Sequence, residues 1–483
     1  FSHKKATGPD TIPIRALKEN KLVLVPILAH LVNLVSVSGI SPNCMKIARV
    51  KPLFKKGDKL SCNNYRPISV LNSVSKVVEK VLSNQVREFL ESNNLLTDFQ
   101  YGFRKKRSTT DAINCIMEQL YENFNNRLIT QGVFLDFSKA FDTINHDILI
   151  AKLPFYNFSS HSCHLIKNYL QDRKQFVSQN RICSNFHSVQ IGVPQGSVLG
   201  PLLFLIYIND LLKSAPELNY ILFADDTNIF STDAELLSDQ LNNVNDWCIA
   251  NRLVINYDKT FQVIFKASTK SFNPLCHEIN ISNKALEQKP STKFLGIELD
   301  STITFKEHFK SLSKKLNINL MMMRALRQYV DQKTIIDIYY SFFYPHLIYG
   351  VEFWGHAADT NLREIKVLQK NALRVIFKVK PGDHISSFFK RHKIMPVKMI
   401  FEYRTLKLLL KTHETDEILN MKTDHGYNTR HNLPKKVRTN NKRGERSLLS
   451  TGIDLFNKYL LEVWTGPGCD LSVGLAERLW AHW

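Results

Sequence analysis

The sequence predicts an α+β protein with more than one domain, and three observations support this. The chain has 483 residues, more than a single hydrophobic core usually serves, so two to four domains or subdomains are expected. Between about residue 111 and residue 300, short apolar runs of strand type alternate with helical patterns. From residue 305 to residue 420 the pattern is mainly helical.

The N-terminal part combines helices with a basic turn region. The longest apolar stretch, residues 22–40, contains Pro26, His30 and Asn33 and is interpreted as a buried helix rather than a membrane span. Residues 51–58 (KPLFKKGD) form a basic, turn-rich strip. Helical spacing resumes in a set of apolar residues: Val74, Val77, Val78, Val81 and Leu82.

The middle of the chain places acidic residues at the ends of apolar runs. Residues 133–135 are typical of a short strand, and Ile144, Ile148, Leu149 and Leu153 indicate a helix after it. Residues 202–212 predict an apolar helix too short to cross a bilayer. Residues 220–223 and 227–230 predict two strands joined through Ala224-Asp225-Asp226, a β-hairpin with acidic residues at its turn.

The C-terminal part is helical and basic, and it ends in a polar tail. Residues 421–447 are strongly basic and are expected to be loop-like or partly disordered until bound. Residues 461–483 indicate nothing specific. Cationic side chains recur along the helical region at Lys314, Lys315, Arg324, Arg327, Lys366, Lys370 and Arg374.

The net charge indicates the kind of partner, and the cysteine pattern indicates the kind of cellular compartment. Lys plus Arg total 64 against 44 for Asp plus Glu, a net charge of +20, which favours nucleic acid over a basic protein with no such partner. The eight cysteines are scattered without a metal-binding or disulfide pattern, so a reducing compartment fits better. No signal-peptide layout is visible, and the start at Phe1 suggests a fragment.

Three aspartates carry the predicted chemistry. Asp136 follows the apolar run at 133–135, and Asp225 and Asp226 stand at the hairpin turn. Carboxylates gathered in one place repel one another unless a cation sits between them. Hard oxygen ligands suit Mg²⁺ or Mn²⁺, and two ions about 3.5–4 Å apart activate an attacking hydroxyl and stabilise a leaving group. Taken singly, each Asp could equally be a turn residue or a helix cap.

A series of motifs in fixed order resembles the reverse transcriptases of non-LTR (LINE-type) retrotransposons, particularly the jockey/CR1-like groups. A single block would be weak support, whereas the whole series is very specific. The blocks are GPD (8–10), PLFKKGD (52–58), NYRPIS (64–69), GFRKKRST (102–109), LDFSKAFD (135–142), GVPQGSVLGP (192–201), FADD (223–226), DKT (258–260) and FLG (294–296). Many relatives carry Tyr where Phe223 stands, and either residue supplies the aromatic ring.

This resemblance implies a right-hand polymerase fold with fingers, palm and helical thumb. The implied domains are an N-terminal extension and fingers (1–130), a palm (131–300) with a fingers segment near 155–190, a helical thumb or connection (301–420) and a basic tail (421–483). The resemblance also makes Asp136, Asp225 and Asp226 ligands of two Mg²⁺ ions, with Mn²⁺ as a possible substitute.

Other roles implied by the resemblance concern the nucleotide. Phe141 would lie under the sugar and exclude a 2′-hydroxyl, although core packing is the alternative for this ring. Gln195 and Gly196 would contact the incoming nucleotide and template, and the FLG block would hold the primer end. The cations Lys55, Lys56 and Arg66 would grip the triphosphate, and Lys259 would be a general acid. A solvated loop or surface lysine is the alternative for the three lysines.

The function implied is RNA-directed DNA polymerisation, with an RNA template, a DNA primer or target DNA and dNTPs as partners and no membrane. Localisation would be nuclear or cytoplasmic, as an element ribonucleoprotein. Two rivals stay open: a catalytically inert nucleic-acid-binding remnant, and another reverse transcriptase such as a group II intron maturase. The three intact aspartates argue against the inert remnant. The residues of the motifs fit the retrotransposon type better than the group II intron type.

Overall fold

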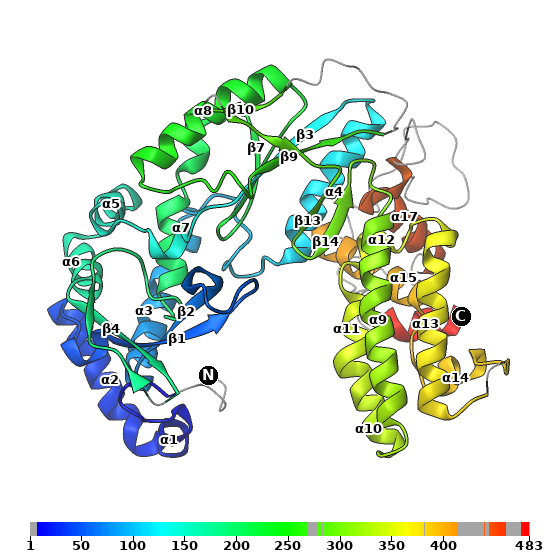
Figure 1. Cartoon of the computed structure of the whole chain (residues 1–483), viewed down its shortest axis with the longest axis horizontal. Coiled ribbons are helices and arrows are strands. Elements are labelled where there is room, and N and C mark those ends of the chain that lie inside the picture. The colour runs from blue at the N-terminus through cyan, green and yellow to red at the C-terminus, as the bar shows by residue number, and fades with distance from the viewer. Residues whose placement is uncertain are drawn as a thin grey trace, which may run out of the picture. The chain divides into compact units, whose positions relative to one another are not determined.

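In the computed structural model, the chain divides into two compact units built from interleaved segments. The first unit comprises residues 1–108, 133–261 and 277–287, and the second comprises residues 109–132, 262–276 and 288–483. The structure describes residues 7–180, 182–267, 278–282, 284–380, 382–413, 439, 444–459 and 475–482. The mixture of helices and sheets (Figure 1) confirms the predicted α+β class.

The first unit begins with helices that pack beside a small mixed sheet. Its helices are α1 (Ile14–Glu19), α2 (Lys21–Ser38) and α3 (Ser73–Ser92). The sheet has the order β2-β1-β4-β5, and β6 also pairs with β4. Its strands are β1 (Ile47–Phe54), β2 (Tyr65–Val70), β4 (Arg173–Gln179), β5 (Ile182–Cys183) and β6 (His187–Val189). β1 pairs antiparallel with β2 and parallel with β4.

A second sheet has the order β12-β9-β3-β8-β7. Its strands are β3 (Thr130–Leu135), β7 (Asn219–Phe223), β8 (Asp226–Ser231), β9 (Phe261–Phe265) and β12 (Glu287–Gln288). The accompanying helices are α5 (His146–Lys152), α6 (Ser160–Leu170), α7 (Gly200–Ile208) and α8 (Ala234–Ala250), and a short hairpin joins β10 (Asn280–Ile281) to β11 (Lys284–Ala285). The predicted strands at 133–135, 220–223 and 227–230 are confirmed, as is the acidic turn between the last two.

The core of the first unit forms around α7, whose residues are almost all buried. Apolar side chains from β3, β7, α5, α6 and α8 surround it in one continuous cluster. A helix that is apolar on every side belongs in an interior of this kind. Because α7 directly follows the GVPQGSVLG segment, this core anchors the turn that contains Gln195.

The helix predicted at residues 22–40 forms as α2, but the prediction that it is buried is wrong. Only Val32 and Val35 are buried, and they pack in a cluster with Val78 and Leu82 of α3. Leu22 and Val37 are 87% and 79% exposed. Val32 and Val35 face the neighbouring helix, and most of the remaining apolar surface of α2 is exposed. By length and composition alone, α2 is apolar enough to cross a membrane, and it is the one such helix among the described residues.

The second unit is mainly helical, as the pattern predicted. α9 (Lys306–Leu326) packs lengthwise against α13 (Asp359–Phe377), as Figure 1 shows. The other described helices are α4 (Thr109–Asn125), α10 (Gln332–Ile338), a π-helical turn (Tyr339–Phe343), α11 (Tyr344–Ile348), α12 (Val351–Trp354), α14 (Ser386–Arg391), α15 (Val397–Thr412), α17 (Leu448–Tyr459) and α18 (Leu475–His482). A hairpin joins β13 (Ser291–Phe294) to β14 (Ile297–Asp300).

The unit boundaries differ from the implied domains in three places, one of which is residues 262–276 of the implied palm, which belong to the second unit. α4 and the β13–β14 hairpin cluster with the second unit, although they were assigned to the first 130 residues and to the palm. The reason is packing, because β14 contacts α9 and α4 contacts the turn before α17. Of the predicted basic tail, residues 421–438, 440–443 and 460–474 lie outside the described residues.

Candidate active site

The first aspartate, Asp136, stands at the end of a fully buried strand. All six residues of β3 are buried, and the chain emerges from the core at Asp136. The Asp136 carbonyl accepts a 2.8 Å hydrogen bond from the Asn256 backbone N–H, and the Asp136 N–H donates to the Thr260 hydroxyl at 3.3 Å. The strand end is therefore tied to the segment that contains Lys259.

The other two aspartates stand at the tight turn between β7 and β8. Phe223 pairs with Asp226, so Ala224 and Asp225 make the two-residue turn. Ala224 has a φ of +58°, in the left-handed region that two-residue hairpin turns require. Since β8 lies next to β3 in the sheet, the turn and the end of β3 come to the same edge.

Asp136 and Asp225 line one common cavity, and Asp226 follows Asp225 directly in the chain. Burial raises the pKa of Asp225, and the negative charge of Asp136 raises it further, while Arg66 and Lys55 oppose the rise. Partial burial, and then the charges of Asp225 and Asp136, raise the pKa of Asp226 to about 6. Repulsion of this kind arises only where like charges are near one another. These shifts agree with the gathering of the three acids that the sequence predicted.

Lys259 lies against the first of these carboxylates. Its Nζ is 3.1 Å from Oδ2 of Asp136, with the two side chains 54% and 37% exposed respectively. The chain reaches this position because residues 256–260 form a turn beside the end of β3. An ammonium group in this place offsets part of the negative charge of the site.

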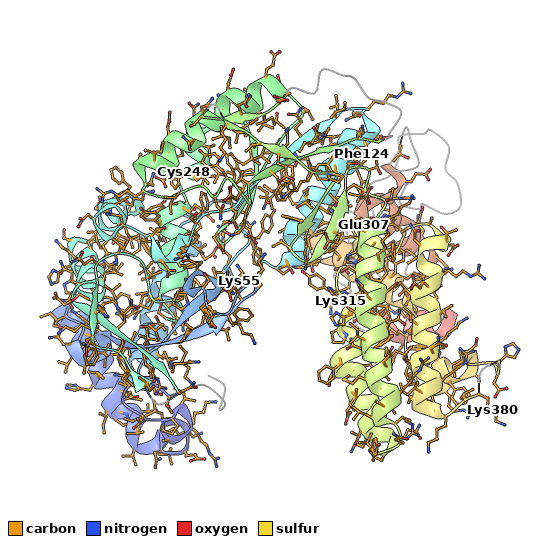
Figure 2. The ribbon with its side chains drawn as sticks, viewed as in Figure 1. Lys55, Phe124, Cys248, Glu307, Lys315 and Lys380 are labelled. Atoms are coloured by element: carbon orange, nitrogen blue, oxygen red, sulfur yellow. The ribbon has the colours of Figure 1, made fainter. Side chains whose placement is uncertain are left out.

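A cavity of about 620 Å³ lies over the carboxylates and contains most of the predicted nucleotide-binding residues. Lys55, labelled in Figure 2, follows the last residue of β1, and Arg66 lies on the paired strand β2. Lys56 is exposed and does not line the cavity. The lining residues predicted from the sequence are Lys55, Arg66, Asp136, Phe141, Gln195, Gly196, Asp225 and Lys259.

Phe141 packs in the core and also lines the cavity, so its position is compatible with both roles that the sequence left open. Its ring stacks on Phe204 of α7 with centroids 4.6 Å apart, which is core packing. Phe141 and Phe103 also form a T-shaped ring pair with centroids 6.3 Å apart, and both rings line the cavity. A ring held by the core on one side presents a fixed surface on the other. This is the geometry that steric selection of a ligand requires.

The Pro-Gln-Gly turn is held from two sides. Gln195 Nε2 donates to both carboxylate oxygens of Asp142, at 2.9 and 2.8 Å, and the Gln195 carbonyl accepts from the Ser69 N–H at 2.7 Å. Gly196 has a φ of +123°, and a Cβ there would lie 2.5 Å from the Ser69 carbonyl oxygen. Only glycine fits this close approach. Burial raises the pKa of Asp142.

Sequence reasoning gave no role to three residues that shape the site. Asp142 and Phe103 were inside quoted motifs but were not singled out. Gln100, which is 2% exposed, bonds to Ala224 beside Asp225. Its position two residues before the GFR block was the only available signal, and a lone glutamine indicates no particular partner.

The donor set fits a hard divalent cation. Three carboxylates, two of them with raised pKa values, are a negative cluster that Lys259, Lys55 and Arg66 compensate only in part and that a cation would relieve. Among the described residues, however, no three acidic, His or Cys side chains form a group that could hold an ion by themselves. Mg²⁺ usually completes its coordination with water and substrate phosphates, so a site shared with a nucleotide agrees with both observations.

The palm-like sheet and its acidic edge are those of a template-directed polymerase, and comparison with known families agrees. Residues 54–299 match the family described as reverse transcriptase (RNA-dependent DNA polymerase). That match covers half of the chain, and the chain belongs to this family. The membership confirms the resemblance stated from the motifs and carries with it the right-hand polymerase fold.

Two of the similar curated proteins come from mobile elements of Drosophila melanogaster. The chain is 30% identical over 399 residues to the probable RNA-directed DNA polymerase from transposon BS of Drosophila melanogaster, covering 77% of this chain and 43% of that protein. It is 27% identical over 390 residues to the RNA-directed DNA polymerase from mobile element jockey of the same species, covering 77% and 42%. The chain thus spans less than half the length of these relatives.

Solved structures with some likeness include a telomerase from Candida albicans in complex with a fragment of telomeric RNA. The identity is 13%, the TM-score is 0.44, and the match covers 74% of this chain and 68% of that one. A likeness at this level carries no weight for function.

Proposed function

We propose that this chain is the polymerase part of a non-LTR retrotransposon protein and adds dNTPs to a primer 3′-hydroxyl on an RNA template. The observation that carries the proposal is the convergence of Asp136, Asp225 and Asp226 at one edge of a buried sheet. Family membership supports the same reaction, and the matched relatives are named for it.

The three aspartates would hold two Mg²⁺ ions, or Mn²⁺ in their place. When bound, the ions supply activation of the attacking hydroxyl and neutralisation of charge on the leaving pyrophosphate. The protein contributes the fixed carboxylates, whose strand and turn backbones need not reorganise as charge develops.

The cations around the site would bind the triphosphate. Lys55 and Arg66 are close enough to Asp225 to oppose the rise in its pKa, so phosphate oxygens placed over the carboxylates lie within their reach. Charge-assisted hydrogen bonds to phosphate are among the strong ones in proteins. Lys56 is exposed and is not among the residues that line the cavity, so it is better explained as a solvated loop residue. Lys259 would donate a proton to the leaving pyrophosphate.

Phe141 and Gln195 would contact the incoming nucleotide. The cavity face of Phe141, fixed by its stacking on Phe204, would exclude a ribose 2′-hydroxyl and so favour dNTP over rNTP. The Gln195 amide, oriented by Asp142, would contact the nucleotide from the α7 side of the site.

The helical unit supplies a basic surface for the nucleic-acid backbone. On α9, Lys314, Lys315 and Arg324 are exposed, and Lys315 is labelled in Figure 2. Contacts of cations with phosphates depend strongly on salt, so binding of primer–template should weaken steeply as ionic strength rises. We place the protein in the nucleus or cytoplasm, bound to its element RNA.

Primer extension on an RNA template with Mg²⁺ tests this function. The wild-type chain should incorporate dNTPs, and Asp225→Ala should abolish incorporation while primer–template binding is retained. Asp239→Ala is the matched control, since Asp239 is an exposed carboxylate on α8 away from the cavity. Equal extension by wild type and Asp225→Ala would reject the site. A wild-type chain that binds nucleic acid but extends no primer would identify an inert remnant.

A further inference from the structure

A short segment before the GFR block adds to the edge of the second sheet directly beside the acidic turn. The Leu222 N–H donates to the Phe99 carbonyl at 2.9 Å, and the Tyr101 N–H donates to the Leu222 carbonyl at 2.8 Å. Gln100 and Leu222 form a parallel β-bridge. Residues 99–101 are therefore hydrogen-bonded to Leu222 of β7, which lies two residues before Ala224 in the turn.

The side chain of Gln100 continues this connection onto the turn itself. Its Oε1 accepts hydrogen bonds from the N–H groups of Gly102, at 2.8 Å, and of Ala224, at 2.9 Å. Its Nε2 makes a longer contact of 3.4 Å with the Ala224 carbonyl. The side chain is 2% exposed, so water does not compete for these groups. The buried Gln100 amide thus contacts both the backbone N–H and the backbone carbonyl of Ala224.

The backbone around this amide is tightly fitted. A Cβ on Gly102 would lie 2.3 Å from the Ala224 nitrogen, so only glycine permits the observed approach. Ala224 is held at a φ of +58°, a conformation that costs energy for a residue with a Cβ. Strained residues of this kind persist where the surrounding structure enforces them. Gln100 and Gly102 provide that enforcement.

Repulsion between carboxylates favours movement of the turn away from the end of β3. The turn carries two adjacent carboxylates, and Asp225 lines the same cavity as Asp136, so like charges repel one another there. Without a cation, this repulsion favours any movement that separates the turn from the end of β3. A contact that holds Ala224 in place opposes that movement.

We propose that Gln100 is a positioning residue that holds the Ala224-Asp225 turn in the geometry needed to bind a divalent cation before the cation arrives. This rests on the proposed function. Gln100 does not reach the carboxylates and acts only through the backbone of Ala224. Partners of this indirect kind, when removed, typically lower metal affinity or activity about 10- to 100-fold.

The test compares Gln100→Leu with a buried glutamine that makes similar bonds elsewhere. Gln369 is 1% exposed, donates from Nε2 to the Met395 carbonyl at 2.8 Å, and accepts at Oε1 from the Val397 N–H at 2.9 Å. Gln369→Leu therefore reproduces the loss of a buried amide that bridges two segments, without touching the acidic turn.

Three measurements separate positioning from general destabilisation. Hydrogen–deuterium exchange of the peptide covering residues 219–231 should be faster in Gln100→Leu and unchanged in Gln369→Leu. Mn²⁺ affinity, measured by electron paramagnetic resonance on the complex with primer–template, should fall about 10- to 100-fold in Gln100→Leu only. In primer extension, the metal concentration for half-maximal rate should rise by the same factor, with KM for dNTP at saturating metal little changed.

A second variant keeps the test decisive if Gln100→Leu does not fold. Gly102→Ala displaces the turn through its Cβ and leaves the Gln100 amide intact, so it should show the same faster exchange and weaker Mn²⁺ binding. Wild-type exchange and Mn²⁺ affinity in both variants would overturn the proposal. Exchange and Mn²⁺ binding are read without turnover, so an inactive wild type would refute the proposed function and still leave this inference decided.

Discussion

Lys259 offers the sharpest test of the chemistry, because a surface ion pair and a general acid predict very different magnitudes. Its Nζ lies 3.1 Å from Oδ2 of Asp136 with both side chains partly exposed. In a water-like dielectric two charges at that separation attract by about 1.3 kcal/mol, and exposed pairs contribute a net of about 0.2–1 kcal/mol to stability. Replacing Lys259 with Met should therefore change the free energy of unfolding by no more than about 1 kcal/mol.

The effect on rate should be much larger if Lys259 gives a proton to the leaving pyrophosphate. General acid catalysis contributes about 10²- to 10⁴-fold, so the rate of single-nucleotide incorporation at saturating dNTP and Mg²⁺ should fall by at least about 10²-fold in Lys259→Met. Lys259→Arg keeps the positive charge but does not release its proton, and it should be nearly as slow.

A purely electrostatic role predicts the opposite outcome. Removing the ammonium group would leave Asp136 free for a cation, so Lys259→Met would need less metal for half-maximal rate and keep its maximal rate. Lys259→Arg would then resemble wild type. Full maximal rates in both variants, measured by rapid quench at saturating metal, would refute the general-acid assignment.

Two further predictions concern selectivity and charge. Phe141→Val should lower the preference for dNTP over rNTP, measured as the ratio of kcat/KM values, by about 10-fold or more. It should also cost about 1–2 kcal/mol of stability because the stacking on Phe204 is lost. Unchanged sugar discrimination would leave Phe141 as a core residue only. The pKa of Asp226 is raised to about 6 in the folded protein, above the ordinary value of 3.8 for an aspartate. The folded state binds more protons in that window, so stability falls as pH rises through it. Mg²⁺ should therefore raise the Tm more at about pH 7.5 than at about pH 5, and Asp226→Asn should raise the Tm of the metal-free protein at about pH 7.5. A pH-independent Mg²⁺ effect would contradict the charge repulsion at the turn.

Local patterns in the sequence were enough to predict the elements that carry the aspartates. The apolar run before Asp136 and the two runs around Ala224-Asp225-Asp226 have the length and composition of buried strands, and the structure confirms all three. Helical spacing likewise predicted α3 and the helices of the second unit. These predictions succeed because periodicity and turn chemistry are properties of neighbouring residues.

Beyond the three aspartates, which the resemblance implies lie together, the sequence did not reveal which segments meet. Gln100 and Ala224 are 124 residues apart, Lys259 and Asp136 are 123 apart, and Gln195 and Asp142 are 53 apart. Each contact depends on strand order and on the turn that brings a side chain back to the sheet edge, and no local pattern encodes either. The same reason explains α2: its composition predicted a helix, but only the tertiary structure decides which side of an apolar helix another helix covers.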